Sequence, residues 1–310
     1  MKCWPRWKKP KRAPPKPTSR RARRFRLRCK GSNRAKRRTC PRPCDYSKKP
    51  PRGWRDDCLL PEGAMRDESH AWIACGGAES GIGLFCFDGG SGALSLMRKT
   101  PVAGGVSYLA LDAKRARLFA VNDARFAEAP KAGDHSGRAH AFAIDPKTLE
   151  LTRLNEQPTH GSSSCYVSVD ATGQCVLAAN FRDFGGFGGP GHGSQGSLAV
   201  LPVGADGRLG EAREVKRHPG HSVHPTRQTA SHPHSAVFDP SNRFALIGDL
   251  GIDKVMIYRV DAAHARLTPG ETPFVQTPPG TGPRHFAFHP TGRFGYLNSE
   301  TSNQIIAYQW

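Results

Sequence analysis

The sequence predicts an all-β protein built from the repeated antiparallel units of a β-propeller. From residue 71 onward, five pairs of β-rich runs follow one another, each pair joined across a polar or glycine-containing turn. No comparable stretch shows the 3.6-residue apolar period of an amphipathic helix. Antiparallel units of roughly four strands, recurring every ~40 to 60 residues, are typical of a propeller, in which radial repetition protects the sheet edges. A stacked β-sandwich is the alternative fold.

Residues 1–64 form a basic segment unlike the rest of the chain. They hold 23 Lys and Arg against 4 Asp and Glu, a net charge of 23 − 4 = +19. The remaining residues hold 46 − 23 = 23 basic and 26 − 4 = 22 acidic side chains, a net charge of +1. The arginine-rich run 20–28, bracketed by prolines, buries too little apolar surface to offset its chain entropy. We therefore expect a disordered tail over 1–64 and an incomplete propeller over 65–310.

The role of the basic segment has several interpretations. Clustered Lys and Arg bind phosphate polymers of any sequence, so a non-specific nucleic-acid arm is one of them. Ser19-Arg20-Arg21 hints at an export signal and the acid-poor composition at a transit peptide, but no apolar core follows. We favour a gene-model extension ahead of Met65, and expect no other nucleic-acid partner.

The five strand pairs can be placed along the chain. Each pair is a β-rich run, a turn and a second β-rich run, and the pairs fall at 72–75 with 83–88, 118–123 with 139–145, 175–180 with 197–202, 243–249 with 254–261, and 294–297 with 305–308. A further strand precedes each pair, for example at 234–239 and 285–289, and ends in a turn such as Asp239-Pro240-Ser241-Asn242. Each repeat is therefore one predicted blade.

Cysteine usage and hydropathy indicate the environment of the chain. The cysteines at 75, 86, 165 and 175 lie among apolar strand residues, where a reduced thiol acts as a small hydrophobe. No run approaches the ~18 apolar residues that a membrane span requires. We expect a reducing, cytoplasmic setting and no membrane partner.

Candidate functional side chains gather near the C-terminus, at the edges of the predicted strands. They occur in Ser231-His232-Pro233-His234-Ser235, in Asp249-Leu250-Gly251-Ile252-Asp253-Lys254-Val255, in Gly282-Pro283-Arg284-His285, and at Glu300. A rigid β scaffold presents chemistry to a ligand at such edges. Asp249 and Asp253 have two interpretations of equal weight: they stabilise a blade hairpin, or they contact a ligand.

Five histidines, at 218, 221, 224, 232 and 234, also suggest a zinc site as an alternative. Pro219, Pro225 and Pro233 mark this segment as a loop without fixed ligand geometry. We expect neither a metal nor a cofactor.

Several long motifs, in order, resemble the seven-bladed propeller lactonases, a family that includes bacterial 6-phosphogluconolactonase and the fungal carboxy-muconate lactonising enzyme. The resemblance covers residues 71–310. Its markers are Ser107-Tyr108-Leu109-Ala110, Ala120-Val121-Asn122, Val167-Ser168-Val169-Asp170, residues 204–210, the paired histidines 232 and 234, Asp249-Leu250-Gly251, Asp253-Lys254-Val255, Gly282-Pro283-Arg284-His285, and Glu300. Seven blades are implied and five repeats are visible, so we expect about two blades to be absent.

The resemblance implies hydrolysis of a sugar lactone, with 6-phosphogluconolactone of the pentose phosphate pathway as the expected substrate. In the lactonising relative a His, an Arg and a Glu act together, which by motif correspond to the His232/His234 pair, Arg284 and Glu300. An arginine fork suits an oxyanion or a phosphate, and a histidine or the glutamate can take the proton of the attacking water.

Phosphate binding is expected from Arg227, Lys254 and His285, and the expected partner is a small phosphorylated sugar lactone. A related propeller that acts on another lactone or catalyses lactonisation, a non-catalytic scaffold and an inactive fragment are the alternatives.

Overall fold

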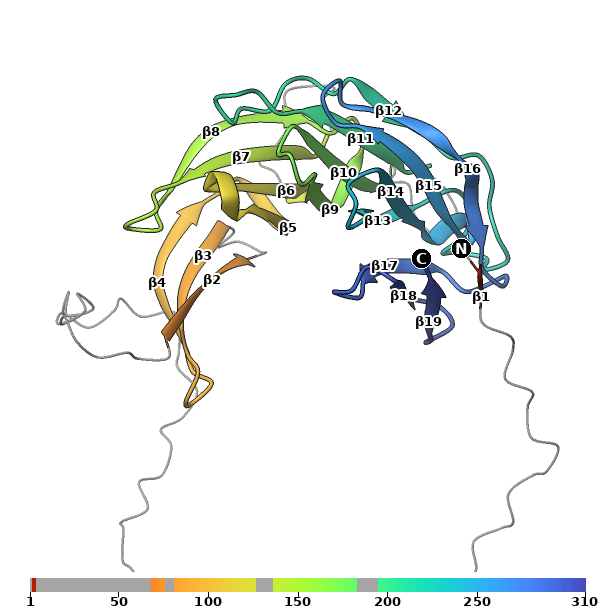
Figure 1. The fold of residues 1–310 in the computed structure, drawn as a ribbon, viewed down its shortest axis with the longest axis horizontal. Helices are drawn as coiled ribbons and strands as arrows, with labels where there is room; N and C mark the ends of the chain where they lie inside the picture. The colour runs from red at the N-terminus through yellow and green to blue at the C-terminus, as the bar shows by residue number, and fades with distance from the viewer. Residues whose placement is uncertain (1, 4–67, 76–80, 127–135, 183–194) are drawn as a thin grey trace, which may run out of the picture. The chain divides into compact units, whose positions relative to one another are not determined.

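The computed structural model describes residues 2–3, 68–75, 81–126, 136–182 and 195–310. These residues form antiparallel sheets that follow one another in chain order (Figure 1). The all-β propeller prediction is confirmed. Apart from Lys2 and Cys3, the basic segment 1–64 lies outside the described residues, so the prediction for it stays a prediction.

Each of the five sheets is one blade. The first contains β2 (Glu68–Cys75), β3 (Gly81–Asp88) and β4 (Leu94–Pro101). The second contains β5 (Gly104–Asp112), β6 (Arg117–Phe126), β7 (Arg138–Ile144) and β8 (Leu151–Pro158). The third contains β9 (Ser162–Val169), β10 (Cys175–Arg182), β11 (Ser197–Pro202) and β12 (Glu214–Lys216).

The fourth sheet contains β13 (Pro233–Phe238), β14 (Phe244–Asp249), β15 (Lys254–Asp261) and β16 (Arg266–Gln276). The fifth contains β17 (Pro283–Phe288), β18 (Phe294–Ser299) and β19 (Ile305–Gln309), and β1 (Lys2–Cys3) pairs with the free edge of β19. In each of the five predicted pairs, the two strands are antiparallel neighbours within the same sheet. The preceding strands predicted at 234–239 and 285–289 are β13 and β17.

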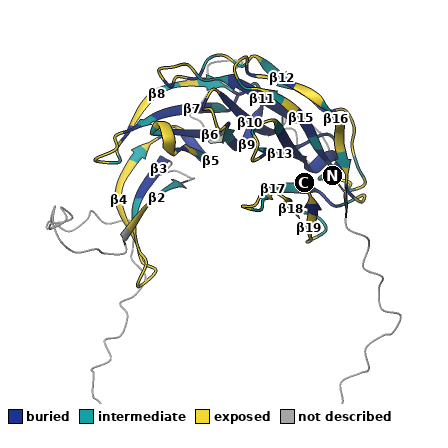
Figure 2. Cartoon of the chain, in the orientation of Figure 1, coloured by how far each residue is buried: buried dark blue, intermediate teal, exposed yellow. Residues whose placement is uncertain are grey.

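The sheets stack face to face through side chains that alternate along the middle strands. On β10, Cys175 and Leu177 pack against the fourth sheet, whereas Val176 and Ala178 pack against the second. Successive side chains of a strand point to opposite faces, so a strand buried on both faces needs an unbroken apolar run. Figure 2 shows this burial along β10 and β11.

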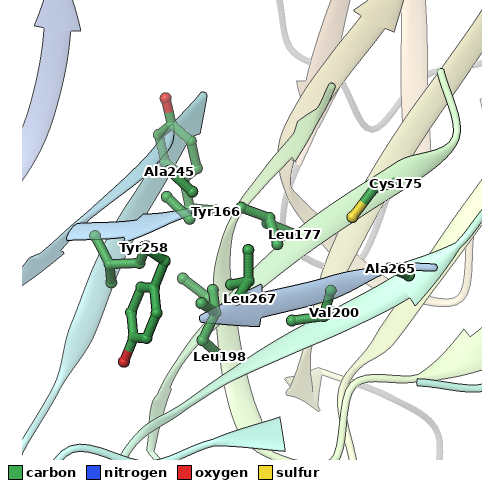
Figure 3. Packing of buried hydrophobic residues seen from close by; sticks show 12 residues of the cluster. Tyr166, Cys175, Leu177, Leu198, Val200, Ala245, Tyr258, Ala265 and Leu267 are labelled. Atoms are coloured by element: carbon green, nitrogen blue, oxygen red, sulfur yellow. The ribbon is translucent and has the colours of Figure 1, made fainter. Parts of the chain in front are cut away.

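The packing between the third and fourth sheets is the best example of this core. Leu198 and Val200 of β11 meet Tyr258 of β15 and Leu267 of β16, and all four are at most 7% exposed (Figure 3). At the terminal sheets, large apolar side chains are exposed, among them Leu94, Leu96 and Met97 on β4 and Tyr296 and Ile305 on the fifth sheet.

Turns at one end of the inner strands tie neighbouring sheets together. Asp239 follows β13 and accepts hydrogen bonds from the backbone of Ser241, Arg243 and Phe244, so the predicted turn is confirmed. From that turn, Asn242 donates to the carboxylate of Asp170 in the third sheet, at 2.9 Å.

Helical structure in the described part of the chain is limited to two single 3-10 turns, η1 (Ala113–Arg115) and η2 (Leu250–Ile252). Neither has the length or the apolar character of a membrane-spanning helix. The turn η2 joins β14 to β15 at the end of the fourth sheet opposite Asp239.

Candidate active site

The same irregularity occurs in each of the inner strands β5, β9, β13 and β17, which contact one another in sequence from sheet to sheet. In each, the register against the neighbouring strand shifts and a residue is left out of the pairing. At corresponding positions these are Ser107, Cys165, His234 and Arg284, and a second shift in β5 also leaves out Gly105. A β-bulge re-aims a side chain and is frequent next to active sites. All four residues line one cavity of about 630 Å³.

Two arginines meet one carboxylate beside this cavity. Arg227 and Arg284 both line the cavity wall, and Glu300 lies between them. Arg227 Nε donates to Glu300 Oε1 at 2.8 Å, and its Nη2 donates to the same oxygen. Arg284 Nε donates to the other oxygen, Oε2, at 3.2 Å. We call Arg227, Arg284 and Glu300 the Arg–Glu–Arg cluster.

The cluster keeps Glu300 ionised. Partial burial raises the pKa of this carboxyl, but the hydrogen bonds and charge of Arg227, with smaller contributions from His234 and Arg284, outweigh it and hold the pKa below its ordinary value. With two guanidinium groups and one carboxylate, the cluster carries a net positive charge.

His234 lies beside the cluster in its neutral form. Its side chain is only 10% exposed, and Nε2 is 4.0 Å from Glu300 Oε2. Burial, together with the positive charge of Arg284 and the neighbouring His285, lowers the pKa of His234 to about 4. Its Nδ1 atom is buried without a hydrogen-bond partner among the described residues. Such an atom has uncompensated hydrogen-bonding capacity, which is exceptional among buried polar groups and occurs at catalytic sites.

His232 has a different position, although sequence analysis paired it with His234. Its ring stacks on Phe181 with centroids 4.5 Å apart, and its Nδ1–H donates to the carbonyl oxygen of Phe181 at 2.7 Å. Burial lowers the pKa of His232 more than this hydrogen bond raises it. The His232 ring is not among the residues that line the cavity, whereas Phe181 is.

Aromatic side chains form another part of the cavity wall, among them Tyr108 and His285. Tyr108 stacks on Tyr166 with centroids 4.1 Å apart, and His285 lies edge-on to both rings. Burial, followed by the hydrogen bond to Tyr108, raises the pKa of Tyr166, and burial followed by the charge of Arg284 lowers that of His285. Both side chains are therefore neutral near pH 7.

Of the seven residues predicted for the site, Arg227, His234, Arg284 and His285 line the cavity, and Glu300 bonds to the two arginines. Lys254 is not brought to the cavity. It lies at the start of β15 with its ammonium 4.1 Å from the ring centroid of Phe274.

The five histidines that suggested zinc are separated by other contacts. His218 Nδ1 lies 2.7 Å from Asp249 Oδ2, and its Nε2 lies 2.9 Å from the hydroxyl of Tyr258. Across the described residues, no three His, Cys, Asp or Glu side chains gather in a group that could hold a metal ion.

Ser107, Cys165, Phe181 and Arg182 also line the cavity but were not predicted from the sequence. A signal for the first two is present in the repeat. Ser107 and Cys165 lie five positions before Asp112 and Asp170, as His234 lies five before Asp239. Superposing the inner strands would have found them.

Fold and site together define a β-propeller with an arginine- and histidine-lined cavity where its inner strands meet. Residues 70–310 match the model of the family described as "Lactonase, 7-bladed beta-propeller". The chain belongs to this family.

The relatives include the 6-phosphogluconolactonase of Bacillus subtilis, 34% identical over 76% of this chain and 60% of the relative. The 6-phosphogluconolactonase of Formosa agariphila is 26% identical over 74% of this chain and 60% of the relative. The structure of a periplasmic gluconolactonase from Pseudomonas aeruginosa superposes with a TM-score of 0.69 at 33% identity, covering 78% of this chain and 64% of that one. The chain thus spans about 60% of the length of these curated relatives.

Proposed function

We propose that this chain hydrolyses a sugar lactone, with 6-phosphogluconolactone as substrate and 6-phosphogluconate as product. The observation that carries the proposal is the Arg–Glu–Arg cluster beside a neutral His234 that lines the same cavity. Hydrolysis of a lactone needs an acceptor for the proton of the attacking water and cationic donors for the oxyanion that forms. Both are present at one cavity, and relatives named 6-phosphogluconolactonase support this reaction.

Charge supports an anionic substrate. The two arginines of the cluster line the cavity, and with the carboxylate of Glu300 they leave a net charge of 2 − 1 = +1. Low-dielectric walls focus such a field and raise the local concentration of anions. Guanidinium groups also match phosphate in a two-pronged geometry. A phosphorylated lactone fits this charge better than a neutral one.

Arg284 is the proposed oxyanion donor. Its guanidinium is on a bulged residue of an inner strand, and it is anchored through Nε, which leaves the Nη groups to be directed at a ligand. As the water oxygen bonds to the carbonyl carbon, negative charge develops on the carbonyl oxygen and is stabilised by this donor. Arg227 then holds Glu300 and contributes to phosphate binding together with His285.

His234 is the proposed proton acceptor. Both oxygens of Glu300 are already bonded to guanidinium groups, which reduces their basicity, whereas neutral His234 lines the cavity and its Nε2 makes no hydrogen bond within the described part of the chain, with Glu300 4.0 Å away. An anion bound near Arg284 offsets part of the positive charge that lowers the pKa of His234, and so makes the imidazole more basic when substrate is present. The proton taken from water is then passed to the ring oxygen as the ester C–O bond breaks. Only water is consumed, so the proposed reaction needs no cofactor.

A reaction of the pentose phosphate pathway is consistent with the cytoplasmic setting inferred from the reduced cysteines. The second candidate is a gluconolactonase acting on an unphosphorylated lactone, because the Pseudomonas aeruginosa structure is described as a periplasmic gluconolactonase.

The test is hydrolysis of 6-phosphoglucono-δ-lactone and D-glucono-δ-lactone by the 310-residue chain, followed as acid release with the spontaneous reaction subtracted. We expect a higher kcat/KM for the phosphorylated lactone. A preference for the neutral lactone would favour the second candidate. Folded protein that accelerates neither reaction would refute lactone hydrolysis.

A further inference from the structure

The turn between β14 and β15 contributes no side chain to the cavity, yet its last residue contacts the two segments that carry the arginines of the Arg–Glu–Arg cluster. Asp253 follows η2 and is fully buried. Its Oδ1 accepts from Gln228 Nε2 and from Gly282 N, both at 2.7 Å. Its Oδ2 accepts from Gly280 N at 2.7 Å and from the hydroxyl of Ser222.

The partners of Asp253 are neighbours of the functional residues. Gln228 follows Arg227 directly, and Gly282 lies two positions before Arg284. The carbonyl oxygen of Gly282 accepts from the backbone N–H of Glu300 at 2.8 Å. One carboxylate therefore connects, through one or two hydrogen bonds, to the backbone beside all members of the cluster.

The hydrogen bonds of the buried Asp253 carboxylate restrain the segments that it joins. Its four donors are two backbone amides, a side-chain amide and a hydroxyl, and a buried carboxylate is tolerated only when hydrogen bonds replace its lost hydration. Conversely, donors left without an acceptor in a buried site are costly, so the segments 222–228 and 280–284 cannot easily move away from Asp253. The bonds are short and come from two directions, which restrains both segments relative to each other.

We propose that Asp253 is a positioning residue that sets the separation of the Arg227 and Arg284 guanidinium groups and hence the geometry around Glu300. It touches no ligand, since its side chain is fully buried and outside the cavity lining. The effect on catalysis rests on the proposed lactone hydrolysis, whereas the effect on the cluster does not. A misplacement of about 1 Å in a reacting group can cost about 10²-fold in rate.

The decisive variant is Asp253→Asn. Asp253 has a positive φ of 54°, and asparagine tolerates this left-handed conformation, so the backbone can be retained. An amide offers one acceptor oxygen instead of two, so either the Gly280 or the Gly282 N–H faces an NH₂ group. The matched control is Asp239→Asn, because Asp239 is also buried and also accepts four hydrogen bonds, but at the turn at the other end of the fourth sheet.

The readout independent of activity is the pair of ¹⁵Nε–¹Hε NMR signals of Arg227 and Arg284, assigned with Arg227→Lys and Arg284→Lys. Both Nε–H groups donate to Glu300, so both Nε hydrogens should exchange slowly with solvent in the wild type and in Asp239→Asn. In Asp253→Asn we expect both signals to move to the position of exposed arginines, and kcat/KM for the lactone to fall about 10²-fold. Folded Asp253→Asn that keeps both signals would overturn the proposal.

Two further outcomes remain decisive. If Asp253→Asn loses both signals while the wild-type protein shows no lactone turnover, the NMR result would support the positioning role. The missing turnover would refute the proposed function. If Asp253→Asn does not fold, Gln228→Leu takes its place. It removes the bonds of the Gln228 side chain to Asp253, Leu250 and the His224 N–H, and leaves the bonds from Gly280 and Gly282 to Asp253 in place. The Arg227 signal should then be lost and the Arg284 signal retained, and retention of both would again overturn the proposal.

Discussion

His234 Nε2 lies 4.0 Å from Oε2 of Glu300, across the contact between β13 and the residue that follows β18. The carboxylate does not keep the imidazole protonated, because Arg227 and Arg284 hold it from the other sides while burial disfavours the charged ring. A neutral base and an ionised acid thus lie side by side at neutral pH. This pair determines the first prediction.

Replacing His234 by Gln should reduce the acid sensitivity of the fold. Burial lowers the folded-state pKa of His234 to about 4, so below its ordinary pKa of 6.5 the unfolded chain takes up a proton that the folded chain does not. Stability is therefore complete above about pH 6.5 and falls as the pH approaches 4, by about 2 to 3 kcal/mol for this imidazole. Urea unfolding at pH 7.5 and 4.5 measures the difference. An equal pH dependence in wild type and His234→Gln would contradict it.

Arg284→Ala should lower kcat/KM for the lactone by roughly 10²–10³, or about 2.7–4 kcal/mol of transition-state stabilisation, as expected for removal of an oxyanion donor. Arg284→Lys should recover only part, since a point charge cannot reproduce the planar fork. Arg259→Ala is the control: Arg259 pairs with Glu271 on the surface, where such pairs contribute little. Steady-state kinetics of the three variants decide the matter, and full activity in Arg284→Ala would exclude the assigned role.

Glu300→Gln should separate turnover from ligand binding. The amide is nearly isosteric, but loss of the carboxylate raises the net charge of the Arg–Glu–Arg cluster from +1 to +2, which favours anions. We therefore expect kcat to fall while 6-phosphogluconate binds more tightly in calorimetry. Weaker binding together with a large loss of stability would instead indicate a purely structural glutamate.

Asn242→Ala should destabilise the contact between the third and fourth sheets without affecting the cavity. Asn242 donates to Asp170, accepts from the backbone N–H of Ala171 at 2.8 Å, and has a positive φ of 59°. Loss of these bonds and left-handed strain in alanine together cost about 2 to 4 kcal/mol. Asn242→Gly should recover only the part of the stability that alanine loses to backbone strain, because glycine also lacks the two hydrogen bonds. Urea unfolding and lactone kinetics would show lower stability with unchanged kcat/KM, and a loss of activity in folded protein would contradict this separation.

The blades could be predicted from the sequence because their signal is local. The apolar run on β10 follows from burial on both faces of the strand, and the turn after β13 follows from Asp239, Pro240 and Asn242. Both depend on neighbours within a few residues. Arg227, His234, Arg284, His285 and Glu300 were also predicted, but as a set of motifs rather than as an arrangement.

The sequence by itself determined which elements form and that functional side chains fall at strand edges. Only the tertiary structure decided that His234 faces the cavity while His232 stacks on Phe181, and that Lys254 lies against Phe274. The physical reason is that a strand's two-residue period predicts alternating faces, whereas one bulged residue changes the direction of a side chain at the site. Which edges then meet depends on the packing of whole sheets, because Arg227 and Glu300 are brought together over 73 positions of sequence only when the fourth and fifth blades stack.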